Sequence, residues 1–332
     1  MKPLEEFLKP TQKGLFKILS KMYEGKAISR KGKFILVKGE APIMLLAHLD
    51  TVHQEPVREI CKSPDGNILM SPQGIGGDDR CGVYALVNAY DMSPQKPWLL
   101  FTCDEEIGGV GATKFCYAYE AGKLPKELEE LKLLIEIDRK GSNDAVYYDC
   151  DNKDFESYIT SKGFKTAFGS FSDISLIAPE LGVAAVNLSS GYYNAHSLNE
   201  YINRKELNSV LAKVIEIIDD AAQPNFPKYE YIERVYHVRN YTKYYNCDPW
   251  GEEAIHYYGQ RQQKLDADPW EDWEEENFSK ELPSEYHGIY EELLELHDAE
   301  ELENLRSEYG NQILYQIYID EYGLFYPVTN EK

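Results

Sequence analysis

Basic residues and long apolar runs are both scarce in this sequence. Its 332 residues include 57 Asp and Glu but 35 Lys and Arg, and the formal net charge is −22. This excess of negative charge argues against nucleic acid or an anionic membrane as a partner. No apolar run approaches the roughly 20 residues that a membrane-spanning helix needs. The opening residues, MKPLEEFLKP, place acids where a secretory signal needs an apolar core, so we expect a cytoplasmic protein.

Cysteine pairs with metal-binding spacing are also missing. The six cysteines are scattered without any CxxC pair, at Cys61, Cys81, Cys103, Cys116, Cys150 and Cys247. This pattern favours neither a thiolate zinc site nor a disulfide framework. We expect free thiols, as is usual in a reducing compartment.

Apolar runs and helical patterns alternate over the first 222 residues, which is typical of a sheet covered by helices. Strands are predicted over residues 34–37, 43–47, 98–103, 132–137 and 183–188. Several are continuous apolar runs, as expected for strands buried on both faces. Helices are predicted over 3–23, where Pro10 can break the helix, and over 80–89, 110–121, 172–178 and 204–222, the last capped by Asn203. The predicted fold class is α/β, with a mixed, mostly parallel sheet covered by helices on both faces.

The composition changes after residue 222. Residues 223–332 hold 25 of the 57 acids, 9 of the 35 bases and 15 of the 26 tyrosines, and DPWGEE is followed by the similar DPWEDWEE. Apolar residues return with helical spacing over 285–322. We predict three regions: a catalytic domain over 1–222, an acidic aromatic linker-like region over 223–284, and a small helical region over 285–332.

Polar residues follow the apolar runs at four places. IMLLA leads to His48, WLLFTCD to Glu105 and Glu106, LKLLIEI to Asp138, and VAAVNLSS, after a few more residues, to His196. A further pair, Asp78 and Asp79, follows GIGG and opens a helix. Because the carboxyl ends of strands in an open α/β sheet meet at one crevice, these side chains are expected to converge there.

Two imidazoles and several carboxylates without thiolates suit a hydrolytic zinc site or a harder divalent ion. Two metals about 3.5–4 Å apart need a bridging carboxylate, and Asp78 fits this role because its helix-start position limits its freedom. His48 and Asp138 could hold one metal, and Glu106 and His196 the other.

Two further carboxylates complete the expected chemistry. Asp50, two residues after His48, can accept the second N–H of that imidazole and fix its orientation. Glu105 points in a different direction from Glu106, so it can take a proton from water and pass it to a leaving amine. Each motif alone has a plainer interpretation, such as a structural histidine, a helix cap or solvated charge. Five such motifs at the ends of elements within one domain are far less probable by chance than any one of them alone.

The ordered segments LLAHLDTVH, GGDDRCGV, TCDEEIGG, IEIDRKG and YYNAHSLNEYI resemble the signatures of the co-catalytic zinc exopeptidases. This superfamily contains peptidase T, carboxypeptidase G-type enzymes, and leucyl and deblocking aminopeptidases, and the resemblance covers about residues 40 to 220. It implies a zinc-exopeptidase, phosphorylase-like fold and two zinc ions per chain, with cobalt or manganese as alternatives. It also implies a cis peptide bond after the bridging aspartate, Glu105 as the base, and five ligands: His48, Asp78, Glu106, Asp138 and His196.

The sequence departs from peptidase T in one respect. Peptidase T and its relatives insert a second domain between the fourth and fifth ligands, whereas Asp138 and His196 are 58 residues apart here. The resemblance therefore predicts a catalytic domain without an inserted lid domain. Loops, another subunit or the acidic C-terminal region would have to close over a substrate.

The resulting hypothesis is hydrolysis of an amide bond by an aminopeptidase or a di- or tripeptidase. One alternative is deacylation of an N-acyl amino acid at the same site. The other is a non-catalytic protein that binds a basic partner, or itself, through the acidic C-terminal region. Candidate substrate contacts, each with a packing, capping or ion-pair alternative, are Arg139, Tyr192, Tyr193, Asn194, Asp79, Ser172 and Asp173.

Overall fold

The computed structural model describes residues 1–234, apart from Gln54 and Ser170, together with Tyr290, Leu293, Leu302, Arg306 and Leu314. The chain divides into two compact units, Met1–His237 and Val238–Lys332. The five described residues of the second unit are helical, and its three described leucines are buried. Of the predicted acidic region over 223–284, residues 235–284 lie outside the described residues. The predicted three-part division of the chain stays a prediction.

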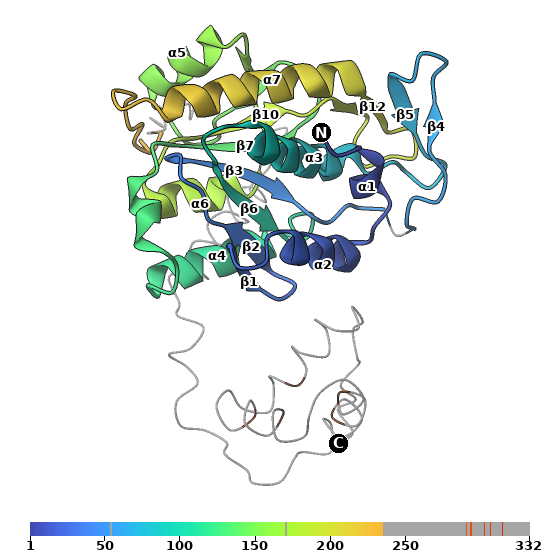
Figure 1. Ribbon diagram of the computed structural model, residues 1–332, viewed down its shortest axis with the longest axis horizontal. Helices are drawn as coiled ribbons and strands as arrows, with labels where there is room; N and C mark the ends of the chain where they lie inside the picture. Colours follow the sequence, from blue (N-terminus) through green and yellow to red (C-terminus); the bar gives the residue numbers. More distant parts are fainter. Residues whose placement is uncertain are drawn as a thin grey trace, which may run out of the picture. The chain divides into compact units, whose positions relative to one another are not determined.

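A mixed sheet of eight strands is the centre of the described part of the first unit (Figure 1). In spatial order its strands are β1 (Ala27–Arg30), β2 (Phe34–Val37), β6 (Trp98–Thr102), β3 (Ile43–His48), β7 (Leu133–Arg139), β10 (Ala185–Ser189), β8 (Asp144–Val146) and β9 (Lys165–Thr166). β6, β3, β7 and β10 run parallel to one another. β1 pairs antiparallel with β2, β2 with β6, and β8 with β10, whereas β9 runs parallel to β8. The predicted mixed, mostly parallel sheet is confirmed.

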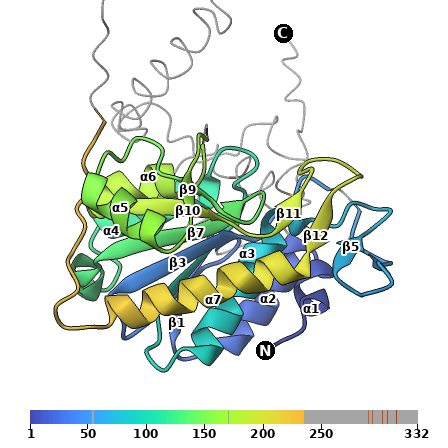
Figure 2. The same cartoon turned by 90° about the horizontal axis from the view of Figure 1, so that it is seen from above.

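Helices cover both faces of this sheet (Figure 2). On one face lie α1 (Glu5–Leu8), α2 (Gln12–Met22), α3 (Gly77–Met92), α5 (Lys153–Ser161) and α7 (Arg204–Ala221); on the other lie α4 (Val110–Glu120), α6 (Ile174–Leu181) and the short 3₁₀ helix η1 (Lys126–Glu130). Along β3, Ile43 and Leu45 belong to the first core layer, whereas Met44 and Leu46 belong to the second. This alternation is why a continuous apolar run is needed in a strand that is covered twice.

The strands and helices predicted over the first 222 residues are all present, with ends shifted by a few residues. The predicted opening helix is divided in two around Pro10, because proline cannot donate the hydrogen bond that a continuous helix requires. The Asn203 side chain caps α7 by accepting a hydrogen bond from the N–H of Glu206. Between Asp138 and His196 the chain forms β8, α5, β9, α6, β10 and β11, all within the first unit.

A second, four-stranded sheet was not predicted. It consists of β11 (Tyr192–Tyr193), β12 (Tyr201–Asn203), β5 (Ile68–Met70) and β4 (Cys61–Lys62). Strands of two or three residues are too short to show an alternating pattern in the sequence. The same reason applies to β8 and β9, which extend the main sheet.

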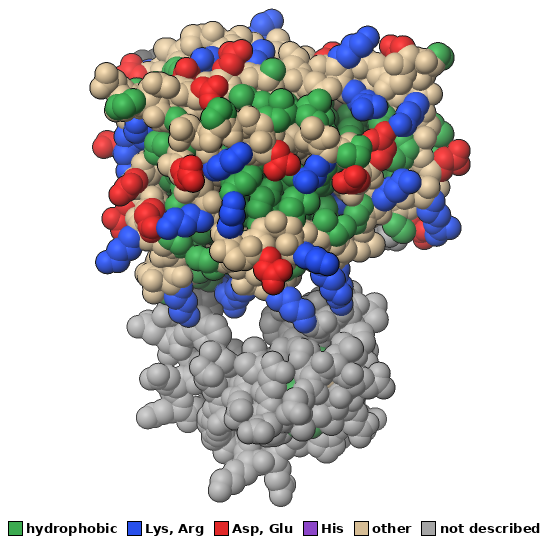
Figure 3. Space-filling model, viewed as in Figure 1, with side chains coloured by type: hydrophobic (Ala, Val, Ile, Leu, Met, Phe, Trp, Pro, Cys, Tyr) green, Lys and Arg blue, Asp and Glu red, His purple; other side chains and the backbone are tan. Residues whose placement is uncertain are grey.

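The surface of the described residues agrees with the charge analysis. On the face shown in Figure 3, acidic and basic side chains are interspersed, and no continuous basic surface is visible over the described part. None of the described helices is long and apolar enough to cross a membrane. The five cysteines within the described residues are free, as predicted.

The core of the sheet yields a first prediction. Leu45, fully buried in the central strand β3, has 0% exposure, and Leu45→Ala should lower the free energy of unfolding by about 2–5 kcal/mol because it leaves a cavity. Ile18→Ala on α2, where Ile18 is 44% exposed, is the matched control and should change it by about 0.5 kcal/mol or less. Equilibrium urea unfolding measures both, and equal effects would contradict this description of the core.

Candidate metal centre

The sequence-predicted residues converge at the carboxyl ends of the parallel strands. β3 ends at His48, Asp138 is the penultimate residue of β7, and Glu105 and Glu106 follow the end of β6 within four residues. Asp78 lies at the start of α3, and His196 lies in the turn that joins β11 to β12. Parallel strands place their carboxyl ends at one edge of the sheet, which brings these distant residues together.

Asp78 lies between two groups of possible ligands. One of its carboxylate oxygens, Oδ1, is 3.2 Å from Nε2 of His48, and the other, Oδ2, is 3.2 Å from Nε2 of His196. His48 Nε2 is also 3.6 Å from Oδ1 of Asp138, and His196 Nε2 is 3.1 Å from Oε1 of Glu106. Each oxygen of Asp78 therefore faces a different imidazole, as a carboxylate that bridges two cations must.

The donor set fits divalent cations. Two groups, His48 with Asp78 and Asp138, and His196 with Asp78 and Glu106, each offer three ligand atoms within 4.8 Å of one another. Imidazole nitrogens and carboxylate oxygens without thiolates are ligands typical of zinc at hydrolytic sites. His48 is fully buried, whereas the His196 side chain is 53% exposed, so the second group lies nearer to solvent.

The electrostatics of the protein alone also favour cations here. Burial raises the pKa of Glu105 to about 9, that of Glu106 to about 7 and that of Asp138 to about 6, and repulsion by neighbouring carboxylates adds to these shifts. Burial acts in the same direction on Asp78, but its hydrogen bonds with the two imidazoles outweigh burial and lower its pKa. The site thus gathers more negative charge than its own histidines balance.

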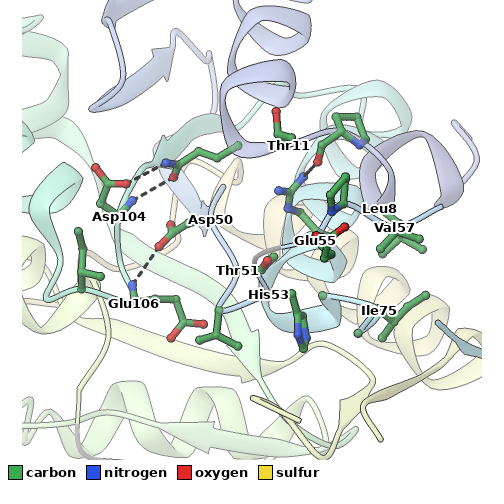
Figure 4. A pocket seen from close by; sticks show the side chains of 18 residues that line it. Leu8, Thr11, Asp50, Thr51, His53, Glu55, Val57, Ile75, Asp104 and Glu106 are labelled. Atoms are coloured by element: carbon green, nitrogen blue, oxygen red, sulfur yellow. Dashed lines mark hydrogen bonds between the residues drawn. The ribbon is translucent and has the colours of Figure 1, made fainter. Parts of the chain in front are cut away.

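Asp50 orients both an imidazole and the loop after β6. Its Oδ1 lies 3.3 Å from Nδ1 of His48, a buried nitrogen that forms no hydrogen bond of good geometry with the described residues. A nearby carboxylate is the usual partner of the second nitrogen of a metal-binding imidazole. The same carboxylate accepts hydrogen bonds from the backbone N–H of Glu105 at 3.1 Å and of Glu106 at 3.0 Å. The latter bond is drawn in Figure 4. Asp50 therefore contributes to the centre by holding His48 and the backbone of the two glutamates.

Glu105, in the loop after β6, has its carboxylate near His48. Its Oε2 lies 4.0 Å from Nε2 of His48, and its side chain is 11% exposed. The adjacent Glu106 instead points to His196. Ligand atoms of both glutamates lie within 4.8 Å of an imidazole nitrogen of His48, and Glu106 also contacts His196.

Asp79, a candidate substrate contact, is enclosed within the fold. Its carboxylate accepts hydrogen bonds from the backbone N–H of Gly82 at 2.9 Å and of His48 at 3.2 Å, and its exposure is 0%. These bonds place Asp79 beneath the ligands, where it holds the backbone of His48. The peptide bond between Asp78 and Asp79 is cis, as the family resemblance implied.

The three candidate substrate contacts before His196 have different hydrogen-bond partners. Tyr192 is buried, and its hydroxyl donates to the backbone carbonyl of Asp138 at 3.2 Å. Tyr193 donates to the carboxylate of Glu206 on α7, and the amide of Asn194 donates to a carbonyl within its own turn. Of these three residues, Tyr192 is the one whose hydrogen bond reaches a candidate ligand residue.

Arg139 and Ser172 make contacts inside the protein. The guanidinium of Arg139 donates to the carbonyl of Phe168 at 3.0 Å and lies 3.9 Å from the carboxylate of Asp144. Ser172 is buried, and its hydroxyl donates to Glu136. Neither Ser172 nor Asp173 caps α6 through its side chain, so the capping alternative was wrong. The buried acids around Ser172 hold its hydroxyl instead.

Two polar residues inside apolar strands were missed. Asn187 on β10 accepts a hydrogen bond from the backbone N–H of Asp138 at 2.9 Å, and Glu136 on β7 is fully buried beside Ser172. A signal was present, because each interrupts an otherwise apolar run, LLIEI or AVNLS. A buried polar residue needs partners, and these two find them beneath the candidate ligands.

A cavity of about 530 Å³ adjoins this centre (Figure 4). Asp50 and Glu106 form its side toward the candidate ligands, and the segment between α1 and α2 forms another side. Its apolar lining includes Leu8, Val57 and Ile75. The cavity therefore extends from the edge of the sheet that carries the candidate ligands toward the N-terminal helices.

Comparisons with known proteins identify the fold. No protein-family model matches the sequence, and no curated protein matches it significantly. A tripeptidase from Staphylococcus aureus and the aminopeptidase PepT from Bacillus cereus each align with a TM-score of 0.50 and 15% identity, over 66% of this chain and 96% and 98% of theirs. A TET aminopeptidase from a marine-sediment archaeon aligns with a TM-score of 0.50 and 12% identity, over 65% and 96%. The chain shares the α/β fold of these peptidases, and the predicted resemblance is confirmed at the level of fold.

Removal of metal should make stability depend strongly on pH. The folded-state pKa values of Glu105 and Glu106, about 9 and about 7, lie above the ordinary 4.5, and that of His196, about 9, lies above 6.5. The folded protein then keeps protons that the unfolded chain releases, so the stability that these three groups contribute is greatest near pH 5 and is lost as pH rises from about 5 to about 9.

Zinc should raise the melting temperature and reduce this pH dependence, because bound cations balance the same carboxylates. Differential scanning fluorimetry in chelator and in excess zinc, from about pH 5 to about 9, measures both effects. A melting temperature that zinc leaves unchanged at every pH would contradict a metal centre.

Proposed function

We propose that this chain is a metal-dependent hydrolase of amide bonds, and most specifically an aminopeptidase or a di- or tripeptidase. The observation that carries this proposal is the position of Asp78, whose two oxygens each face a different imidazole while Glu105 lies alongside. The fold shared with a solved tripeptidase and solved aminopeptidases supports a peptide as the substrate. Free cysteines support work in a reducing compartment such as the cytoplasm.

Five side chains would hold two metal ions, with zinc as the first expectation and cobalt or manganese as alternatives. His48 and Asp138 would bind one ion, His196 and Glu106 the other, and Asp78 both. Bound zinc would polarise the scissile carbonyl, make a water molecule more acidic and lower the pKa of Glu105.

Glu105 is the proposed general base and acid. Its carboxylate lies 4.0 Å from Nε2 of His48 and accepts no hydrogen bond from the described residues, and its backbone N–H is held by Asp50. It would accept a proton from the attacking water and then transfer that proton to the amine that leaves. Asp50 keeps the loop of Glu105 and the ring of His48 in a fixed relation during both transfers.

Glu105→Gln tests the base directly. The amide has nearly the same shape but cannot accept the proton, so kcat should fall at least about 100-fold while the zinc content stays close to that of the wild type. A dipeptide and tripeptide panel with N-acetyl amino acids alongside measures turnover, and elemental analysis measures zinc. Wild-type turnover in Glu105→Gln would show that another group is the base, and cleavage of the N-acetyl amino acids alone would favour the deacylase alternative.

Asp78→Ala tests the bridge. Removal of the shared carboxylate should weaken binding of both ions, because each candidate group loses one of its three ligands. Zinc titration by calorimetry measures the loss, with Asp144→Ala, at the start of β8 and outside the ligand groups, as a control. Retention of two tight zinc sites in Asp78→Ala would exclude a bridging role.

A further inference from the structure

Glu200 is a fully buried carboxylate with no part in the site as described so far. Its Oε1 accepts a hydrogen bond from the backbone N–H of Asp78, and its Oε2 accepts one from that of Gly76, both at 2.9 Å. Nε2 of His53 lies 2.9 Å from the same Oε2. One carboxylate thus holds the backbone of the loop that presents Asp78 and an imidazole from the loop that follows β3.

Glu200 also belongs to the loop that carries His196. It follows His196 by four residues, its own N–H donates to the carbonyl of Ser197 at 3.1 Å, and β12 starts at the next residue. Asp78 and His196, two of the three candidate ligands of the outer group (Asp78, Glu106 and His196), therefore come from loops that meet at Glu200. The distance between Asp78 and His196 depends on how these two loops are held together.

The packing around Glu200 leaves little freedom for the Asp78 loop. A side-chain carbon at Gly77 would lie 2.7 Å from Cβ of Tyr192 and 3.2 Å from Oε1 of Glu200, so the backbone here is pressed against both. On the other side, a carbon at Gly74 would lie 2.2 Å from Nδ1 of His53. The loop is enclosed between the His53 ring and the loop of Glu200.

The chemistry of this contact calls for a carboxylate. Two backbone N–H groups and one imidazole nitrogen surround it, and an ionised carboxylate has acceptors alone to offer them. A glutamine would direct its NH₂ group at one of these donors and leave an N–H without an acceptor. Because the group is buried, that loss would act directly on the loop geometry.

We propose that Glu200 is a positioning residue that sets the separation of Asp78 and His196, and that His53 supports it. This inference rests on the proposed function, since it concerns how that metal centre is held. His53 lines the cavity beside the centre (Figure 4), so the hydrogen bond from His53 to Glu200 also links the cavity wall to the bridging aspartate. A substrate that fills the cavity would contact the His53 ring, which also supports the loop of Asp78 through Glu200.

Glu200→Gln in the full chain is the test. We expect zinc affinity at the outer group, and kcat, to fall roughly 10- to 100-fold, with little change in KM. The metal-free protein should stay folded, with its melting temperature lowered by a few degrees because a buried N–H loses its acceptor. Asp220→Asn is the matched control, because Asp220 accepts comparable hydrogen bonds from Tyr158 and Lys162 away from the site. Zinc titration and turnover in Glu200→Gln that equal those of Asp220→Asn would overturn the proposal.

Two variants of His53 test the supporting role. His53→Gln keeps an N–H that can donate to Glu200, whereas His53→Phe keeps the ring shape without a donor. We expect His53→Phe to weaken zinc binding, as Glu200→Gln does. His53→Gln should bind zinc almost as tightly as the wild type. Equal zinc affinities in His53→Phe and His53→Gln would show that the hydrogen bond from His53 does not support Glu200.

Amide hydrogen exchange separates this proposal from the proposed function. In the metal-free wild type the N–H groups of Gly76 and Asp78 should be protected, and Glu200→Gln should remove this protection while α7 keeps its own. If the wild type binds no zinc and cleaves no peptide, the proposed function fails, and the exchange result still decides the role of Glu200. Unchanged protection in Glu200→Gln would contradict that role.

Discussion

Repulsion among buried carboxylates is the constraint on which this site depends. Glu105, Glu106 and Asp138 lie around two imidazoles at the edge of the sheet, and burial raises the pKa of each. Such a collection of like charges is unfavourable in a protein interior unless protons or cations balance it. Asp78 resolves the conflict in part, because its two oxygens each face an imidazole.

The fold supplies the rigidity that this arrangement needs. Parallel strands bring His48 and Asp138 to the same edge, and other carboxylates hold the backbone around them rather than the centre itself. Asp79 accepts from the N–H of His48, Asp50 from the loop of the two glutamates, and Glu200 from the loop of Asp78. Acids close to the centre thus have two separate tasks, to face the cations or to fix the backbone that presents those that do.

The sequence predicted the sheet, and the gathering of the candidate ligands at its edge, because both leave strong local signals. Continuous apolar runs marked β3, β6 and β7, and polar residues directly after them marked the edge where they meet. Contacts that depend on tertiary packing could not be predicted in this way. Glu200 resembles any loop acid in the sequence, and its burial follows from the pairing of β12 with β5, two strands of three residues each.

The central claim is that Asp78 bridges two metal ions, and anomalous X-ray scattering at the zinc edge tests it most directly. Crystals of the full chain grown with zinc should show two peaks about 3.5–4 Å apart. One peak should lie beside His48 and Asp138, the other beside His196 and Glu106, with an oxygen of Asp78 next to each. A single peak, or two peaks that do not share Asp78, would contradict the account.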